Sequence, residues 1–180
     1  MSRALFTAAA GLAMLALAIP ASAENIYCTI VGAKQGSIQS DSGPAGNSKL
    51  IPVLAFMQEV TVPYDQSAGL ASGKVTHSPV TIVKPLDGAS PQLFAAAVTN
   101  EVLRSVACTF YRETTQAANH AYFKITLTNA AIVEYKDNGN GVNGTAVGDD
   151  RESIQLTYQK IDIEDLDTNT SAVDDWSAPG

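Results

Sequence analysis

The chain has 180 residues, with 11 basic and 18 acidic side chains, so its formal charge at neutral pH is −7. Lys and Arg are nowhere clustered, and the excess of carboxylates would repel a nucleic-acid duplex or an anionic lipid surface. Composition therefore excludes a nucleic-acid-binding protein and indicates a soluble domain.

Residues 1–23 have the organisation of a secretory signal peptide. Arg3 lies in a short polar start, an apolar run extends to Ile19, Pro20 breaks it, and residues 21–23 read Ala-Ser-Ala, the pattern that a signal peptidase cleaves. A membrane span is the weaker interpretation, because a bilayer needs about 20 apolar residues. We therefore expect a mature chain that begins at Glu24, is periplasmic or secreted, and has no membrane span.

Removing Arg3 leaves 10 basic and 18 acidic residues, so the mature charge is 10 − 18 = −8. The length suits one domain, which we place at 24–165. The acidic residues 166–180 show no periodicity, and we expect them to form a flexible tail.

The domain is predicted to be mainly β, with the two sheets of a β-barrel or sandwich and one short α-helix. Runs of strand-forming residues between Gly, Ser, Asn and Asp clusters predict strands at 26–31, 50–62, 75–83, 105–112, 122–135 and 153–164. In the fifth strand, alternation places Phe123, Ile125, Leu127, Ala131 and Val133 on one face. In the sixth, the apolar positions change phase near 159–160, which predicts a β-bulge.

The helix is predicted at about 91–99. Ser90 can cap it, Pro91 at its first position has no amide proton to leave unsatisfied, and Asn100 can close it. Its expected buried face consists of two i, i+4 pairs, Leu93 with Ala97 and Phe94 with Val98. Before it, residues 84–85 (Lys-Pro) end a strand and residues 87–88 (Asp-Gly) form a turn.

Two cysteines, Cys28 and Cys108, lie in the predicted strands "IYCTIV" and "VACTFYR". Alternation places both thiols on core-facing positions. An oxidising compartment permits a disulfide between them, and two buried free thiols are the alternative. The sequence leaves these two interpretations open, because it does not show whether the two strands are neighbours.

We find no residues arranged for catalysis, cofactor binding or metal binding, and so expect no enzyme, no cofactor and no metal. His77 and His120 are the only imidazoles. Neither lies in a nucleophile or metal-ligand motif. Each is near a strand end, where a solvated or loop-bonded histidine is the ordinary interpretation.

The stretch "GKVTHSPVTIVKPLDGASPQLFAAAV" at 73–98 resembles the haemolysin-coregulated protein (Hcp) family, the tube subunits of type VI secretion systems. The resemblance lies in the Gly-Lys, the strand into Lys-Pro, the Asp, and the Ser-Pro-x-Leu helix start. The flanking segments are similar to family strands in the same order, namely "IYCTIVGAKQGSIQS", "KLIPVLAFMQEV", "ACTFYR", "AYFKITLTNAAIVEY" and "ESIQLTYQKIDIE". Residues 35–37 depart from the family, with Gln-Gly-Ser in place of Gly-Glu-Ser.

The resemblance implies a β-barrel whose copies form six-membered rings that stack into a hollow tube. It implies small exported effectors and spike or sheath components as partners, and assembly in the cytoplasm before secretion. The loop 63–72 matches the family's extended loop, so its assembly residues would be Pro63, Tyr64, Asp65, Gln66 and Leu70.

A leader does not fit a tube that assembles in the cytoplasm. The alternative is therefore an exported β-sandwich, a ligand-binding or adhesion module that no longer forms a tube. The oligomeric state of the mature chain distinguishes the two.

Overall fold

The computed structural model describes residues 24–44, 47–114, 119–139 and 150–177, and the predicted leader lies outside these ranges. The strands are β1 (Asn25–Gly32), β2 (Gly36–Ser37), β3 (Ile51–Val53), β4 (Ala55–Met57), β5 (Val60–Thr61), β6 (Tyr64–Asp65), β7 (Leu70–Ala71), β8 (Thr76–His77), β9 (Val80–Pro85), β10 (Leu103–Arg112), β11 (His120–Asn138), β12 (Arg151–Thr157), β13 (Lys160–Asp165) and β14 (Thr170–Asp175), and the helix is α1 (Ser90–Val98). Within the described ranges, no helix has both the length and the apolar character needed to cross a bilayer. The prediction of a mainly β fold with one short helix is confirmed.

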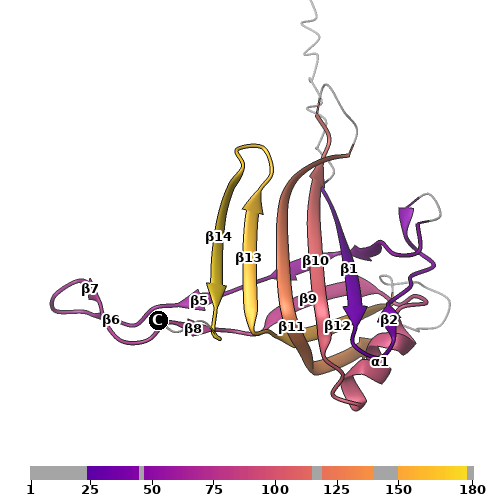
Figure 1. Cartoon of the computed structure of the whole chain (residues 1–180), viewed down its shortest axis with the longest axis horizontal. Helices are drawn as coiled ribbons and strands as arrows, with labels where there is room; N and C mark the ends of the chain where they lie inside the picture. Colours follow the sequence, from indigo (N-terminus) through magenta and orange to yellow (C-terminus); the bar gives the residue numbers. More distant parts are fainter. Residues whose placement is uncertain (1–23, 45–46, 115–118, 140–149, 178–180) are drawn as a thin grey trace, which may run out of the picture.

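The strands form one ten-stranded antiparallel sheet and two small two-stranded sheets. The long strand β11 joins the two halves of the large sheet (Figure 1). Its first part pairs with β10 and β13, and its second part pairs with β12, which continues to β9 and β4. The two predicted sheets are thus continuous through β11, and the apolar core lies between the two halves.

Two predicted long strands are divided in the structure. The strand expected at 50–62 becomes β3, β4 and β5, because β3 pairs with β1 whereas β4 pairs with β9 in the other half of the sheet. The strand expected at 75–83 divides into β8 and β9 at Ser78 and Pro79. Proline has no amide proton for a ladder, which accounts for the second break.

The buried face of β11 changes phase at Asn129. Ile125 and Leu127 are buried as alternation predicts, but beyond Asn129 the buried residues are Ala130 and Ile132, while Val133 is exposed. Asn129 has a φ of 50°. This left-handed conformation, which asparagine tolerates better than most residues, interrupts the alternation, so the placement of Val133 in the core was wrong.

The phase change near 159–160 marks a corner and not the predicted bulge. The strand β12 pairs with the second part of β11, and β13 pairs with its first part. The chain therefore crosses from one half of the sheet to the other between Thr157 and Lys160, and the apolar residues on both sides of the corner can point into the core.

The sheet continues beyond the predicted domain end at 165. Residues of the expected tail form β14, which pairs with all six residues of β13 (Figure 1). The expectation of a flexible tail was therefore wrong for 170–175. Cross-strand hydrogen bonding, which depends on β13 and not on local periodicity, organises this segment.

The helix α1 begins and ends close to the predicted residues, with a different cap. Ala89 occupies the N-cap position and makes no side-chain cap bond, so the expected Ser90 cap was wrong. Instead, the Asp87 carboxylate accepts the Ala89 amide at 2.9 Å and the Ser90 hydroxyl accepts the Asp87 amide at 3.0 Å, which fixes the turn before the helix. At the other end Asn100 has a φ of 48°, and the amides of Asn100 and Glu101 bond to the carbonyls of Ala97 and Ala96. This Schellman arrangement confirms the predicted helix end.

The buried face of α1 differs from the two predicted i, i+4 pairs. Ser90, Leu93 and Ala96 are buried, whereas Phe94 and Val98 are 52% and 61% exposed. The helix packs on β11 through one narrow face, so the pair Phe94 and Val98 was wrongly assigned to the core.

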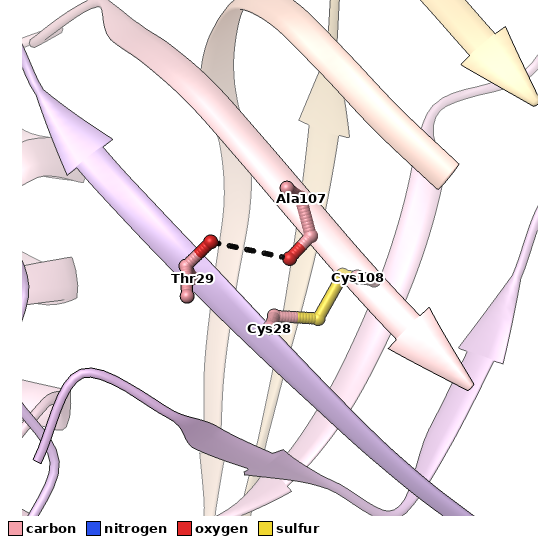
Figure 2. The surroundings of a disulfide bond; sticks show 4 residues. All are labelled: Cys28, Thr29, Ala107 and Cys108. Atoms are coloured by element: carbon pink, nitrogen blue, oxygen red, sulfur yellow. Dashed lines mark hydrogen bonds between the residues drawn. A yellow bond between two sulfur atoms is a disulfide. The ribbon is translucent and has the colours of Figure 1, made fainter. Parts of the chain in front are cut away.

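The predicted core positions of both cysteines are confirmed, since Cys28 and Cys108 are 0% exposed. They are directly paired on β1 and β10, with Cα atoms 4.0 Å apart, and their sulfur atoms are bonded in the structure (Figure 2). On the adjacent pair, the Thr29 hydroxyl donates to the Ala107 carbonyl at 3.5 Å. The disulfide thus lies between neighbouring strands in the core.

Candidate functional site

The two halves of the large sheet and the core between them form the body of the domain, which we call the barrel. The segment 58–78 forms a long hairpin that projects away from this barrel, and we call it the arm (Figure 1). Two short ladders hold its strands together, β5 with β8 near the barrel and β6 with β7 near the tip. The loop 63–72 that the family resemblance singles out is the outer half of this arm. Its residues are exposed on both faces of the hairpin.

The tip of the arm is an ordered turn. The Asp65 carboxylate accepts the Ser67 amide at 2.8 Å, the Ser67 hydroxyl at 2.6 Å and the Ala68 amide at 3.3 Å. These hydrogen bonds lower the pKa of Asp65, and the bond from the Ser67 hydroxyl has the largest effect. Gly69 completes the turn with a φ of 66°, and its amide donates a hydrogen bond to the Asp65 carbonyl. The ladder beside this turn pairs Tyr64 with Ala71 and Leu70 with Asp65, so Tyr64 and Leu70 lie on opposite faces of the hairpin.

The arm carries apolar side chains that its own barrel does not cover. Tyr64 and Leu70 near the tip are 64% and 68% exposed. Closer to the barrel, Val60, Val62 and Val75 are also more than one third exposed. A line of exposed apolar residues on a projecting hairpin is typical of a surface that another polypeptide covers.

A buried charge cluster holds the base of helix α1 to the sheet. Lys84 on β9 is 0% exposed, and its Nζ lies 2.7 Å from Asp87 Oδ1 and 2.8 Å from Glu152 Oε1 on β12. The hydroxyl of Tyr135 donates to Glu152 Oε2 at 2.6 Å. Burial, and then the bond to Glu152, raises the pKa of Tyr135. The charged groups of the cluster hydrogen-bond one another, and two of them, Lys84 and Asp87, belong to the stretch 73–98 that resembles the family.

The same cluster holds the loop that follows β2. The hydroxyls of Ser40 and Ser42 each donate to Asp87 Oδ2 at 2.6 Å. A second carboxylate, Glu101 at the end of α1, accepts the Lys34 amide at 2.6 Å and the Gln35 amide at 2.9 Å. The Gln35 side chain also donates to Glu101 at 2.9 Å, so the residues that depart from the family pattern are bound to the helix end.

The sequence contains a signal for this cluster that we did not use. Lys84 is in phase with Val80 and Ile82 on β9, and Glu152 is in phase with Ile154 and Leu156 on β12. A charged residue in phase with a buried face is expected to be buried, and two of opposite sign can be partners. We predicted only that Lys84 precedes a strand-ending proline.

The two histidines have different surroundings. His120 is exposed and lies 2.6 Å from Asp167, as expected for a loop-bonded histidine. His77 at the base of the arm has a side chain only 7% exposed, in contact with Asp174. The described residues hold no cluster of three or more side chains able to bind a metal ion.

Comparison with known proteins identifies relatives over most of the chain. The family model described as "Type VI secretion system effector, Hcp" matches residues 27–164. The major exported protein of Pseudomonas aeruginosa is 32% identical over 164 residues, which cover 85% of this chain and 95% of that protein.

Solved structures agree with this match. A crystal structure of an Hcp protein superposes with a TM-score of 0.78 and 25% identity, over 87% of this chain and 100% of the other. The secreted protein Hcp3 from Pseudomonas aeruginosa has a TM-score of 0.70 and 30% identity, also over 87% and 100%. The chain therefore belongs to the Hcp family of type VI secretion system proteins, which are structural proteins and not enzymes.

Proposed function

We propose that the mature chain is an exported tube subunit that forms six-membered rings, and that these rings stack into a hollow tube. Small effectors would be carried inside, and spike or sheath components would bind the assembled tube. The proposal rests on family membership. Head-to-tail contacts between identical copies can close a ring, and contacts between ring faces can extend it into a filament.

The observation that carries the proposal is the exposed apolar arm. Tyr64 and Leu70 are held by an ordered turn and have no cover from their own barrel. A neighbouring copy that covers them would bury apolar surface at roughly 25 cal/mol per Å². Asp65 and Gln66 would then form the polar rim around these two anchors, beside Pro63.

The test is the oligomeric state of the mature chain by size-exclusion chromatography with light scattering. The wild type is expected to elute as a six-membered ring. Replacing residues 64–70 with a Gly-Ser linker should leave the circular dichroism of the barrel unchanged and weaken or abolish the ring. A matched control, Ala68→Ser, changes the same turn but keeps the five assembly residues, and it should keep the ring.

Two results would contradict the proposal: a wild-type monomer at high concentration, or a linker variant whose ring is as stable as the parent's. The wild-type monomer would favour the exported ligand-binding or adhesion module, whereas a ring that persists in the linker variant would show that the arm does not hold the ring together.

We also propose that Cys28 and Cys108 are bonded in the exported protein. Their direct pairing across β1 and β10 supports it. In the chain-entropy model a crosslink closing a loop of this length contributes roughly 4 kcal/mol. Peptide mapping without reductant should recover the two peptides linked, and two alkylatable thiols in the denatured protein would contradict the bond.

A further inference from the structure

The base of the arm is bound to the barrel through His77 on β8. Its Nε2 lies 2.7 Å from Asp174 Oδ2 on β14, and its Nδ1 lies 3.2 Å from the Tyr158 hydroxyl. With Nε2–H donating to the carboxylate, Nδ1 accepts the hydroxyl proton, so both ring nitrogens have partners.

Trp176 covers the same histidine. Its ring centroid lies 5.3 Å from that of His77 and 5.5 Å from that of Tyr158, and the rings of His77 and Tyr158 are 6.1 Å apart. Aromatic pairs at such separations are worth roughly 0.5–1.5 kcal/mol beyond their area burial. The Trp176 amide donates to the Gln159 carbonyl at 3.0 Å, which fixes the end of β14 beside the corner between β12 and β13.

Three segments distant in the sequence therefore meet in one cluster: the arm, the β12–β13 corner and the end of β14. We call His77, Tyr158, Asp174 and Trp176 the latch. The arm continues the β4–β9 pair of the large sheet, with Met57 opposite Thr81 and the Ser78 amide donating to the Glu59 carbonyl at 3.1 Å. The latch therefore adds a side-chain anchor to this two-stranded connection. A small rotation at the latch would displace the tip, where Tyr64 and Leu70 lie, by a larger distance.

We propose that His77 is a positioning residue that holds the arm at a defined angle to the barrel by binding Asp174 and Tyr158, so that the arm reaches a second copy of this chain in the right direction. The inference rests on the proposed assembly for its consequence. The latch itself lies within one chain. The C-terminal strand β14 thus acts on assembly through the arm, although it is not part of the arm.

The latch can be observed directly, because Trp176 is the one tryptophan of the chain. Trp176 is 52% exposed, and its remaining cover comes from His77 and Tyr158. In the mature protein, His77→Ala and Asp174→Ala should each shift the Trp176 emission to longer wavelength, because the ring loses these contacts. Amide exchange in 76–78 and in 60–61 should become roughly tenfold faster, because local opening at the arm's base costs less. Ring formation should require roughly tenfold more protein.

Rescue distinguishes positioning from general destabilisation. His77→Gln restores a donor toward Asp174 and should recover part of the ring and of the exchange protection, which His77→Ala lacks. Val173→Thr is the matched control, since Val173 is exposed on the same strand and pairs with Asp162 instead of facing the arm. It should behave as wild type. If His77→Ala does not fold, Asp174→Ala tests the same contact from an exposed residue.

The outcomes separate the two proposals. Unchanged Trp176 emission and unchanged arm exchange in His77→Ala and Asp174→Ala would overturn the latch, whatever the oligomeric state. An altered latch with a ring as stable as the parent's would overturn its positioning role. A wild type that stays monomeric would contradict the proposed function, while emission and exchange in the monomer would still decide whether the latch holds the arm.

Discussion

At the scale of single residues, Lys84 shows how this fold buries a charge. Its ammonium group has acceptors on Asp87, Glu152, Ser90 and the Pro85 carbonyl, all within 3.3 Å. Removing such charges from water is costly, and the cluster is stable inside the protein because each charged group has hydrogen-bond partners. Removing one member leaves its partners buried without compensation.

Lys84→Ala is therefore expected to lower the free energy of unfolding by about 3–5 kcal/mol, because the carboxylates of Asp87 and Glu152 lose their counter-charge inside the protein. Urea unfolding followed by circular dichroism measures this. Lys136→Ala is the matched control, since Lys136 also pairs with a glutamate, Glu134, but is 60% exposed. Exposed pairs contribute up to about 1 kcal/mol. An equal loss of unfolding free energy in the two variants would show that the buried cluster contributes no more than an exposed ion pair.

Asp87 should make the free energy of unfolding depend on pH in the acidic range. Burial alone would raise its pKa, but hydrogen bonds from Lys84, Ser40, Ser42 and the Ala89 amide outweigh burial and lower the pKa. The charged form thus contributes stability above the unfolded pKa of about 3.9, and the contribution disappears as the pH falls through the lower folded pKa. Asp87→Asn should be less stable than wild type at pH 7, and this gap should narrow below about pH 4. Urea unfolding at a series of pH values checks it, and a constant gap would contradict the assignment.

At the scale of elements, helix α1 depends on its two ends. Hydrogen bonds between Asp87 and Ser90 fix the turn before its start, and Asn100 closes it in the left-handed conformation. The next residue, Glu101, binds the first loop. The helix end and the loop are thus held by adjacent residues. A change at Asn100 should act on both.

Asn100→Ala should destabilise the protein by roughly 1–2 kcal/mol, because alanine lacks the short polar side chain that lets asparagine adopt the left-handed conformation. Asn100→Gly keeps access to the left-handed region and should stay close to wild type. Thermal unfolding of both variants provides the comparison. If Ala and Gly behaved alike, the backbone conformation would not be what Asn100 contributes.

At the scale of the whole molecule, a barrel carries a projecting arm, and a disulfide joins the neighbouring strands β1 and β10 in its core. The relatives named above include an exported and a secreted protein. The predicted leader at 1–23 is the part of the sequence that would direct this chain to export.

The chain expressed with its own leader is expected to yield a mature protein that begins at Glu24, because residues 21–23 form a signal-peptidase site. Intact-mass measurement of the periplasmic or secreted fraction checks this. Replacing Ala21 and Ala23 with bulky residues should block cleavage and serves as the control. Retention of Met1 on a functional protein would show that the apolar segment is not a leader.

The sequence by itself determined the local elements and the family. Alternation placed Cys28 and Cys108 on core positions, and the residues around Pro91 and Asn100 located the helix within one residue at each end. These features depend on neighbours along the chain, whose chemistry is visible in the sequence. The family motif, with its Lys-Pro, Asp and Ser-Pro, is local in the same way.

Only the tertiary structure decided which distant segments meet. Alternation cannot show that β1 lies beside β10, that Lys84 meets Glu152, or that the acidic C-terminal residues pair with β13. His77 was expected to be solvated or bonded to a loop, and it is enclosed because β14 and the β12–β13 corner converge on the arm's base. A polar side chain is stable in such a place only when partners arrive from other strands, and that depends on the fold as a whole.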